Sequence, residues 1–155
     1  ALPIYGCRRG AGLRRRLCRV RRAGPSDAML LVDTSIWSDH LRRHDAAMAR
    51  RLEAGEVLAH PFVIGEIACG VFPRRSETLA LLDCLPSAPL LGQAELLGFI
   101  ERHALAGKGV GFVDIHLIAS ALVAGAGVWT RDRRLADVVA ALGVAAGEPR
   151  ATDRR

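Results

Sequence analysis

The stretch that decides the fold is MLLVDTSIW, residues 29–37. An apolar run leads to Asp33, and Thr34 and Ser35 follow at the point where a helical pattern of apolar residues begins. This pattern is typical of a buried strand that runs directly into a helix, because Asp, Ser and Thr are preferred at helix N-termini. The stretch therefore predicts the first strand-to-helix unit of an α/β domain.

Units of the same kind follow along the rest of the chain. Strands are predicted at 30–33, 56–59, about 88–91 and 128–130. Helices are predicted at 36–42, 46–54, 62–72, 77–85, 94–106, 113–124 and 134–142. Short strands that alternate with amphipathic helices predict an α/β fold with a central, mostly parallel sheet.

The two ends of the chain differ in composition from this domain. Residues 1–28 carry eight arginines and one acid, whereas residues 29–155 carry 14 basic and 15 acidic side chains. We expect a disordered Arg-rich leader at 1–28, a domain at 29–146 and a polar tail at 147–155. The leader could be an RNA-binding arm or a targeting segment, but a strand pattern starts immediately after Met29. We therefore expect that the leader is not part of the natural product, and the overall charge says little about the domain's substrate.

Membrane insertion and structural cysteines are not expected. No apolar run reaches the roughly 18 residues that span a bilayer, and the N-terminus lacks an apolar signal core. The four cysteines form no C-x-x-C pair, so we expect neither disulfides nor zinc. These features predict a cytoplasmic protein with no membrane partner.

Two aspartates follow predicted strands. Asp33 ends the first strand, and Asp132 comes directly after the last one, in VWTRD. In an open parallel sheet, ligands bind beyond the carboxyl ends of the strands. Both carboxylates are therefore candidate functional groups, although Asp33 could only cap a helix and Asp132 could be an ordinary loop acid.

Two further acids stand alone in apolar helices. Glu66 is the only charged residue of PFVIGEIACGVF, and Asp114 is the only acid of GFVDIHLIASALV. Neither has a basic partner at helical spacing. Glu66 could pair with a distant arginine, and Asp114 could merely favour the helix dipole.

Taken together, the four acids indicate a shared function. Carboxylates that converge on one crevice repel each other unless a cation neutralises them. Oxygen ligands suit Mg²⁺, or Mn²⁺, better than zinc. Such ions activate water and stabilise charge on a phosphodiester, so hydrolysis of nucleic acid is the leading hypothesis.

Four motifs in this order, MLLVDTSIW, GEIACG, GFVDIHLIASAL and VWTRDRRLADV, resemble those of PIN-domain ribonucleases, and most of all VapC toxins. The resemblance covers residues 29 to about 144. It implies a PIN-like three-layer α/β/α fold with a mostly parallel sheet of four or five strands. It also implies an Mg²⁺-dependent endoribonuclease, the toxin of a type II toxin–antitoxin system.

The resemblance further implies roles for individual residues. It implies that Asp33, Glu66, Asp114 and Asp132 are catalytic and hold Mg²⁺, with Asp33 and Asp114 as the direct metal ligands. Ser35 and Thr130 match supporting hydroxyl positions, although each also suits a cap or turn. The implied partners are an RNA substrate, a VapB-type antitoxin that blocks the acidic pocket, and a second copy of the chain in a homodimer.

Three arginines surround Asp132 and are candidates to bind RNA phosphates: Arg131, Arg133 and Arg134. The five histidines lack a ligand spacing, so we assign no catalytic histidine. Two other functions stay open. One is another Mg²⁺-dependent phosphohydrolase, and the other is a catalytically silent module that binds RNA or an antitoxin.

Overall fold

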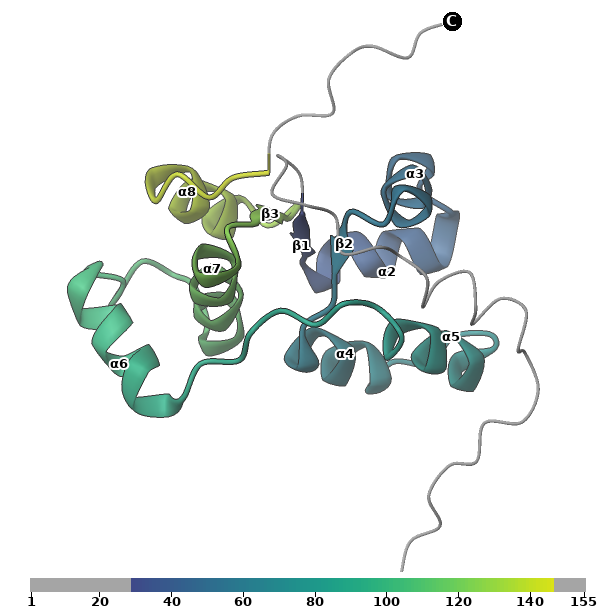
Figure 1. Ribbon diagram of the computed structural model, residues 1–155, viewed down its shortest axis with the longest axis horizontal. Coiled ribbons are helices and arrows are strands. Elements are labelled where there is room, and N and C mark those ends of the chain that lie inside the picture. The colour runs from purple at the N-terminus through teal and green to yellow at the C-terminus, as the bar shows by residue number, and fades with distance from the viewer. Residues whose placement is uncertain (1–28, 147–155) are drawn as a thin grey trace, which may run out of the picture.

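Three short parallel strands form the centre of the structure, for which the computed structural model describes residues 29–146 (Figure 1). Strand β1 (Leu30–Val32) lies between β2 (Val57–Leu58) and β3 (Gly127–Trp129). Leu30 is opposite Val57 on one side and Gly127 on the other. All three residues of β1 are buried, which is the reason for its continuous apolar sequence.

Each edge of this sheet is extended by one isolated bridge. Ser87 pairs with Ala59 beyond β2, and Ala145 pairs with Val128 beyond β3. The second bridge requires Gly127, because a Cβ atom there would lie only 2.8 Å from the Cα of Ala146. The mostly parallel sheet is confirmed, but its predicted count of four or five strands is not.

The strand predicted at 88–91 is wrong. The chain there approaches the sheet through Ala88, whose N–H donates to the carbonyl of Ala59 at 2.8 Å, and then leaves it. Pro86 and Pro89 flank this contact. Proline has no N–H to donate and is confined to strand edges, so the pairing cannot extend into a ladder.

Seven helices surround the strands in the described part of the chain. They are α2 (Thr34–Arg43), α3 (Ala46–Ala54), α4 (Pro61–Ala68), α5 (Arg75–Leu82), α6 (Gln93–Arg102), α7 (Phe112–Ala124) and α8 (Arg133–Ala141). All seven correspond to predicted helices. Helix α4 ends before its predicted limit at 72, and the chain then passes through Gly70 and Pro73, two residues that disfavour helix.

Helices lie on both sides of the strands in Figure 1, with α6, α7 and α8 to the left and α2 and α3 to the right. Helix α7 is the most deeply buried: an unbroken run from Ile115 to Ala121 is inaccessible to solvent or nearly so. It contacts β1, β3 and α6. Within residues 29–146, no helix combines the length and apolar character that a membrane span requires.

Candidate active site

Asp33 is a buried carboxylate at the carboxyl end of β1. Its Oδ1 accepts a hydrogen bond from the N–H of Thr34 at 2.7 Å, which caps α2. Its Oδ2 accepts from the hydroxyls of Ser35 at 2.6 Å and Thr130 at 2.9 Å. Burial of a charge is costly unless it is hydrogen-bonded, and these donors supply that compensation.

Glu66 reaches the same region from α4. Its Oε2 accepts a hydrogen bond from the hydroxyl of Thr34, the residue next to Asp33. Glu66 is exposed, although its helix is otherwise apolar. The helix presents this carboxylate to solvent beside Asp33. This role of Thr34 was not predicted from the sequence, although its place between Asp33 and Ser35 was a usable signal.

Asp132 follows β3 and caps α8. Its Oδ1 accepts from the N–H groups of Arg134 at 2.8 Å and Leu135 at 3.1 Å. Its own N–H donates to the hydroxyl of Thr130 at 3.0 Å, and that hydroxyl donates to Asp33. Thr130 therefore links the two aspartates that follow neighbouring strands.

Asp114 lies in the first turn of α7, where its Oδ2 accepts from the N–H of Gly111 at 2.7 Å. Burial raises the pKa of the Asp114 carboxyl, and the negative charges of Asp33, Asp132 and Glu66 raise this pKa further, against the effect of the Gly111 hydrogen bond. The other three predicted acids are therefore close enough to act on Asp114, although the four come from separate segments of the chain.

Three of these acids are held at helix N-termini. Asp33 precedes α2, Asp132 precedes α8 and Asp114 lies in the first turn of α7. The unpaired N–H groups of a helix start carry partial positive charge, which stabilises a nearby carboxylate. The cap expected as an alternative for Asp33 and the helix-start position expected for Asp114 are thus present in the structure, and Asp132 is a helix cap rather than an ordinary loop acid. This placement explains how negative charges accumulate at one end of the sheet without a basic partner.

The acids suit a hard divalent cation by their chemistry, since every donor is a carboxylate oxygen. Glu66, Asp114 and Asp132 each keep one oxygen that accepts no hydrogen bond from the described residues. No three His, Cys, Asp or Glu side chains within residues 29–146 lie close enough to enclose an ion as they stand. The carboxylate oxygens fit Mg²⁺, but the acidic side chains must move closer together to enclose the ion.

The three arginines near Asp132 differ in their contacts. Arg131 forms ion pairs with Asp39 and Asp45. Arg133 and Arg134 are exposed and form no ion pair within the part of the chain that the structure describes. The side chain of Arg134 lies against Gly109, because a Cβ atom there would meet its Cδ at 3.2 Å. The Arg134 side chain therefore lies against the loop that precedes Asp114.

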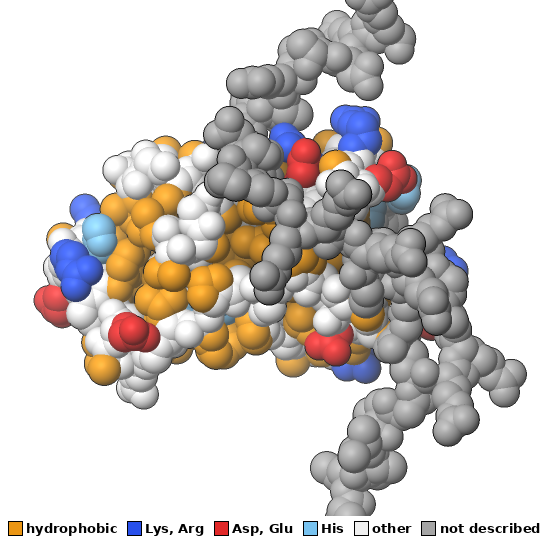
Figure 2. Space-filling view, viewed as in Figure 1, with side chains coloured by type: hydrophobic (Ala, Val, Ile, Leu, Met, Phe, Trp, Pro, Cys, Tyr) orange, Lys and Arg blue, Asp and Glu red, His pale blue; other side chains and the backbone are white. Residues whose placement is uncertain are grey.

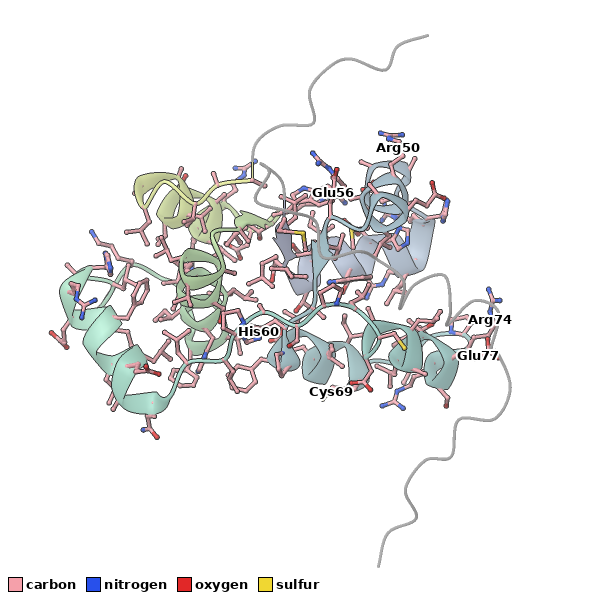
Figure 3. All side chains as sticks on the ribbon, viewed as in Figure 1. Arg50, Glu56, His60, Cys69, Arg74 and Glu77 are labelled. Atoms are coloured by element: carbon pink, nitrogen blue, oxygen red, sulfur yellow. The ribbon has the colours of Figure 1, made fainter. Side chains whose placement is uncertain are left out.

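Two buried histidines lie where α4 approaches α7, and Figure 3 shows His60 at this junction. His60 caps α4 by accepting from the N–H of Phe62 at 3.2 Å, and its Nε2 is 3.2 Å from the hydroxyl of Ser120. The ring of His116 packs against Phe62 and Phe112. Burial lowers the pKa of both rings, that of His60 to about 4 with a further contribution from His116. These neutral rings serve packing and capping.

Comparisons with known proteins bear on the whole described region. A family model described as the PIN domain matches residues 30–141. The chain is similar to "Ribonuclease VapC32" of Mycobacterium tuberculosis, in the strains CDC 1551 / Oshkosh and ATCC 25618 / H37Rv. In both cases it is 45% identical over 121 residues, which cover 77% of this chain and 98% of the relative. Residues 30–141, which the PIN-domain model matches, contain all four acids.

Proposed function

The chain belongs to the PIN-domain family as a VapC-type ribonuclease, and from this premise we propose that it is an Mg²⁺-dependent endoribonuclease, the toxin of a type II toxin–antitoxin pair. The observation that carries the proposal is that four carboxylates from separate segments meet: Asp33 and Asp132 both contact Thr130, and Glu66 contacts Thr34. Burial and the three nearby charges also raise the pKa of Asp114, and a divalent cation would relieve both effects.

We assign Asp33 and Asp114 as direct ligands of Mg²⁺, with Glu66 and Asp132 as the acids that complete the site. A bound Mg²⁺ supplies charge stabilisation to the phosphodiester and lowers the pKa of attacking water. Ser35 and Thr130 hold Asp33 in place by donating to its Oδ2. Thr34 holds Glu66 in the same way.

RNA phosphates would be bound by Arg133 and Arg134. Both flank Asp132 on α8, and neither is neutralised by an acid among the described residues. Phosphate contacts of this kind fix the register of a nucleic acid without reading its sequence. The RNA cleaved, and its sequence, would be selected by surfaces outside the four acids.

The proposed partners are a VapB-type antitoxin and a second copy of the chain. An antitoxin could block the acids with a guanidinium, which binds carboxylates strongly. Several large apolar side chains are exposed, among them Leu90, Leu97 and Phe112. Figure 2 shows hydrophobic side chains gathered over the α6 and α7 side of the molecule. Exposed apolar area of this kind is typical of a protein interface, which supports a homodimer. A cytoplasmic location follows from the same proposal.

Cleavage of structured RNA by the full chain tests this function. Wild type is expected to cleave with Mg²⁺ and to be inactive in EDTA. Asp33→Asn and Asp114→Asn should each lower the rate by roughly a hundredfold or more, which is about 2.7 kcal/mol in activation free energy. Asp137→Asn, an exposed acid of α8, is the matched control and should cleave normally. Equal cleavage by wild type and both variants would reject the proposal.

Two alternatives make different predictions in this assay. A catalytically silent module would bind RNA or antitoxin but would cleave nothing with any metal. Another Mg²⁺-dependent phosphohydrolase would release phosphate from small phosphoesters and leave RNA intact. Transfer and ribosomal RNA are the first substrates to compare with such small esters.

A further inference from the structure

Arg131 occupies the turn between β3 and α8, directly between Thr130 and Asp132. Its guanidinium contacts one acid in α2 and one at the start of α3. One nitrogen, Nη1, donates to Asp39 on α2, and the other, Nη2, donates to Asp45 at 2.7 Å. A planar guanidinium can bridge two carboxylates in this way, whereas an ammonium group is a single point charge.

Asp45, one of the two acids that receive Arg131, is itself fixed. Asp45 caps α3 through its Oδ1, which accepts from the N–H of Ala47 at 2.8 Å, and offers its Oδ2 to Arg131. The hydrogen bond from the N–H of Met48 lowers the pKa of the Asp45 carboxyl, and the charge of Arg131 adds to this effect. Asp45 is therefore ionised at neutral pH, and the arginine is held by an anchored partner.

The backbone of Arg131 is tied to the acid site. Its N–H donates to the hydroxyl of Ser35 at 3.1 Å, and that hydroxyl donates to Asp33 at 2.6 Å. The N–H of the next residue, Asp132, donates to Thr130, whose hydroxyl also donates to Asp33. The turn that carries Arg131 thus closes a ring of hydrogen bonds around Asp33.

We propose that Arg131 is a positioning residue that clamps the β3–α8 turn onto α2 and α3 and thereby fixes Asp132, Ser35 and Asp33 relative to each other. Its own charge is neutralised by Asp39 and Asp45, so RNA phosphate is left to Arg133 and Arg134. The catalytic consequence rests on the proposed nuclease function, but the clamp itself does not.

The proposal predicts that Arg131 and Asp39 act as a unit. Arg131→Gln removes both contacts of the clamp, whereas Asp39→Asn removes the contact with α2 and leaves the ion pair with Asp45. Arg131→Gln should lower kcat by about tenfold and Asp39→Asn by less, since small displacements of catalytic groups are costly. Both should also raise the Mg²⁺ concentration at which thermal stabilisation is half complete. The double variant should be no worse than Arg131→Gln alone.

RNA binding in EDTA separates this role from phosphate contact. Arg131→Gln and Asp39→Asn should leave the Kd for RNA and its salt dependence unchanged. Arg133→Gln is the comparison variant, and it should weaken binding and reduce the salt slope by about one. The proposal is overturned if Arg131→Gln behaves like Arg133→Gln, or if Asp39→Asn retains the kcat and Mg²⁺ response of wild type.

The thermal measurements keep the test independent of the nuclease assignment. If wild type cleaves no RNA, the proposed function fails, but a non-additive loss of melting temperature in the Arg131 and Asp39 pair still supports the clamp. Strictly additive losses would overturn it. Asp39 is partly exposed and caps no helix, so Asp39→Asn is expected to fold even if Arg131→Gln is poorly stable.

Discussion

Helices α4 and α7 each contribute to two polar regions of opposite character. At the acid site, α4 supplies Glu66 and α7 supplies Asp114. At the buried histidine cluster, His60 caps α4, and α7 supplies His116 and Ser120. Burial shifts pKa values toward the neutral form in both regions, upward for Asp114 and downward for the two histidines.

The difference lies in how each region meets the cost of burial. The histidines give up their charge and become packing groups, so the cluster needs no ligand. The acids are instead held by helix N-termini and hydroxyl donors, and none of them forms an ion pair with a basic side chain within residues 29–146. A polar cluster that retains unneutralised charge is a better candidate for chemistry than one that sheds it.

The largest expected effect concerns Asp33, where chemistry and structure coincide. Asp33→Ala should destabilise the fold by about 3 kcal/mol, because it removes the cap of α2 and leaves two hydroxyls without their acceptor. Asp33→Asn retains a capping oxygen and should lose less stability, although it loses activity. Urea denaturation in EDTA measures both. Wild-type stability in Asp33→Ala would show that these hydrogen bonds do not hold the site.

The histidine cluster should respond to acid. The unfolded chain protonates His60 near its ordinary pKa of 6.5, whereas the folded chain resists protonation down to about 4. Stability is therefore fully present above pH 6.5 and is lost as the pH falls toward 4, by about 2 kcal/mol between pH 7 and 4.5.

Denaturation at several pH values checks this expectation. His60→Asn can still cap α4 and should lose much of the slope, whereas His44→Gln, at an exposed position, should keep it. An unchanged slope in His60→Asn would assign the acid sensitivity to other groups.

The smallest expected effect concerns Thr34, which joins Asp33 to Glu66. Thr34→Val keeps the shape of the side chain but removes the hydroxyl that donates to Glu66. Loss of one hydrogen bond to a charged group should slow RNA cleavage by about tenfold, or roughly 1.4 kcal/mol. Thr34→Ser keeps the hydroxyl and should cleave nearly as wild type. If both variants lose the same activity, the methyl packing of Thr34 matters and its hydrogen bond does not.

Much of the fold could be predicted from the sequence, because hydrophobic periodicity and caps decide local structure. The run that leads to Asp33 predicted β1 and the helix that follows it, and the helix predicted at 134–142 corresponds to α8, although the cap formed by Asp132 was not predicted. The prediction failed at 88–91, where apolar residues suggested a strand but two prolines limit the pairing. Sheet edges depend on contacts with distant segments, which periodicity does not reveal.

Some of the site residues could likewise be predicted from the sequence, and others could not. Asp33 and Asp132 could be found from their places after strands. Glu66 could be found as the only charged residue of an apolar helix, but its exposure could not be predicted because it depends on how α4 packs. The hydrogen bond from Thr34 to Glu66 and the ion pairs of Arg131 join segments far apart in the sequence. Tertiary contacts of this kind could not be read from local spacing.

The most direct test of the acid site is the melting temperature of wild type and Asp114→Asn, each with and without Mg²⁺. The pKa of Asp114 is raised in the fold, so its ionised form costs stability at neutral pH. Asparagine can still accept from Gly111. In EDTA, Asp114→Asn should melt a few degrees higher, by about 3 °C. Added Mg²⁺ should stabilise wild type and leave the variant nearly unchanged. A variant that melts lower in EDTA and keeps the Mg²⁺ shift would contradict the account.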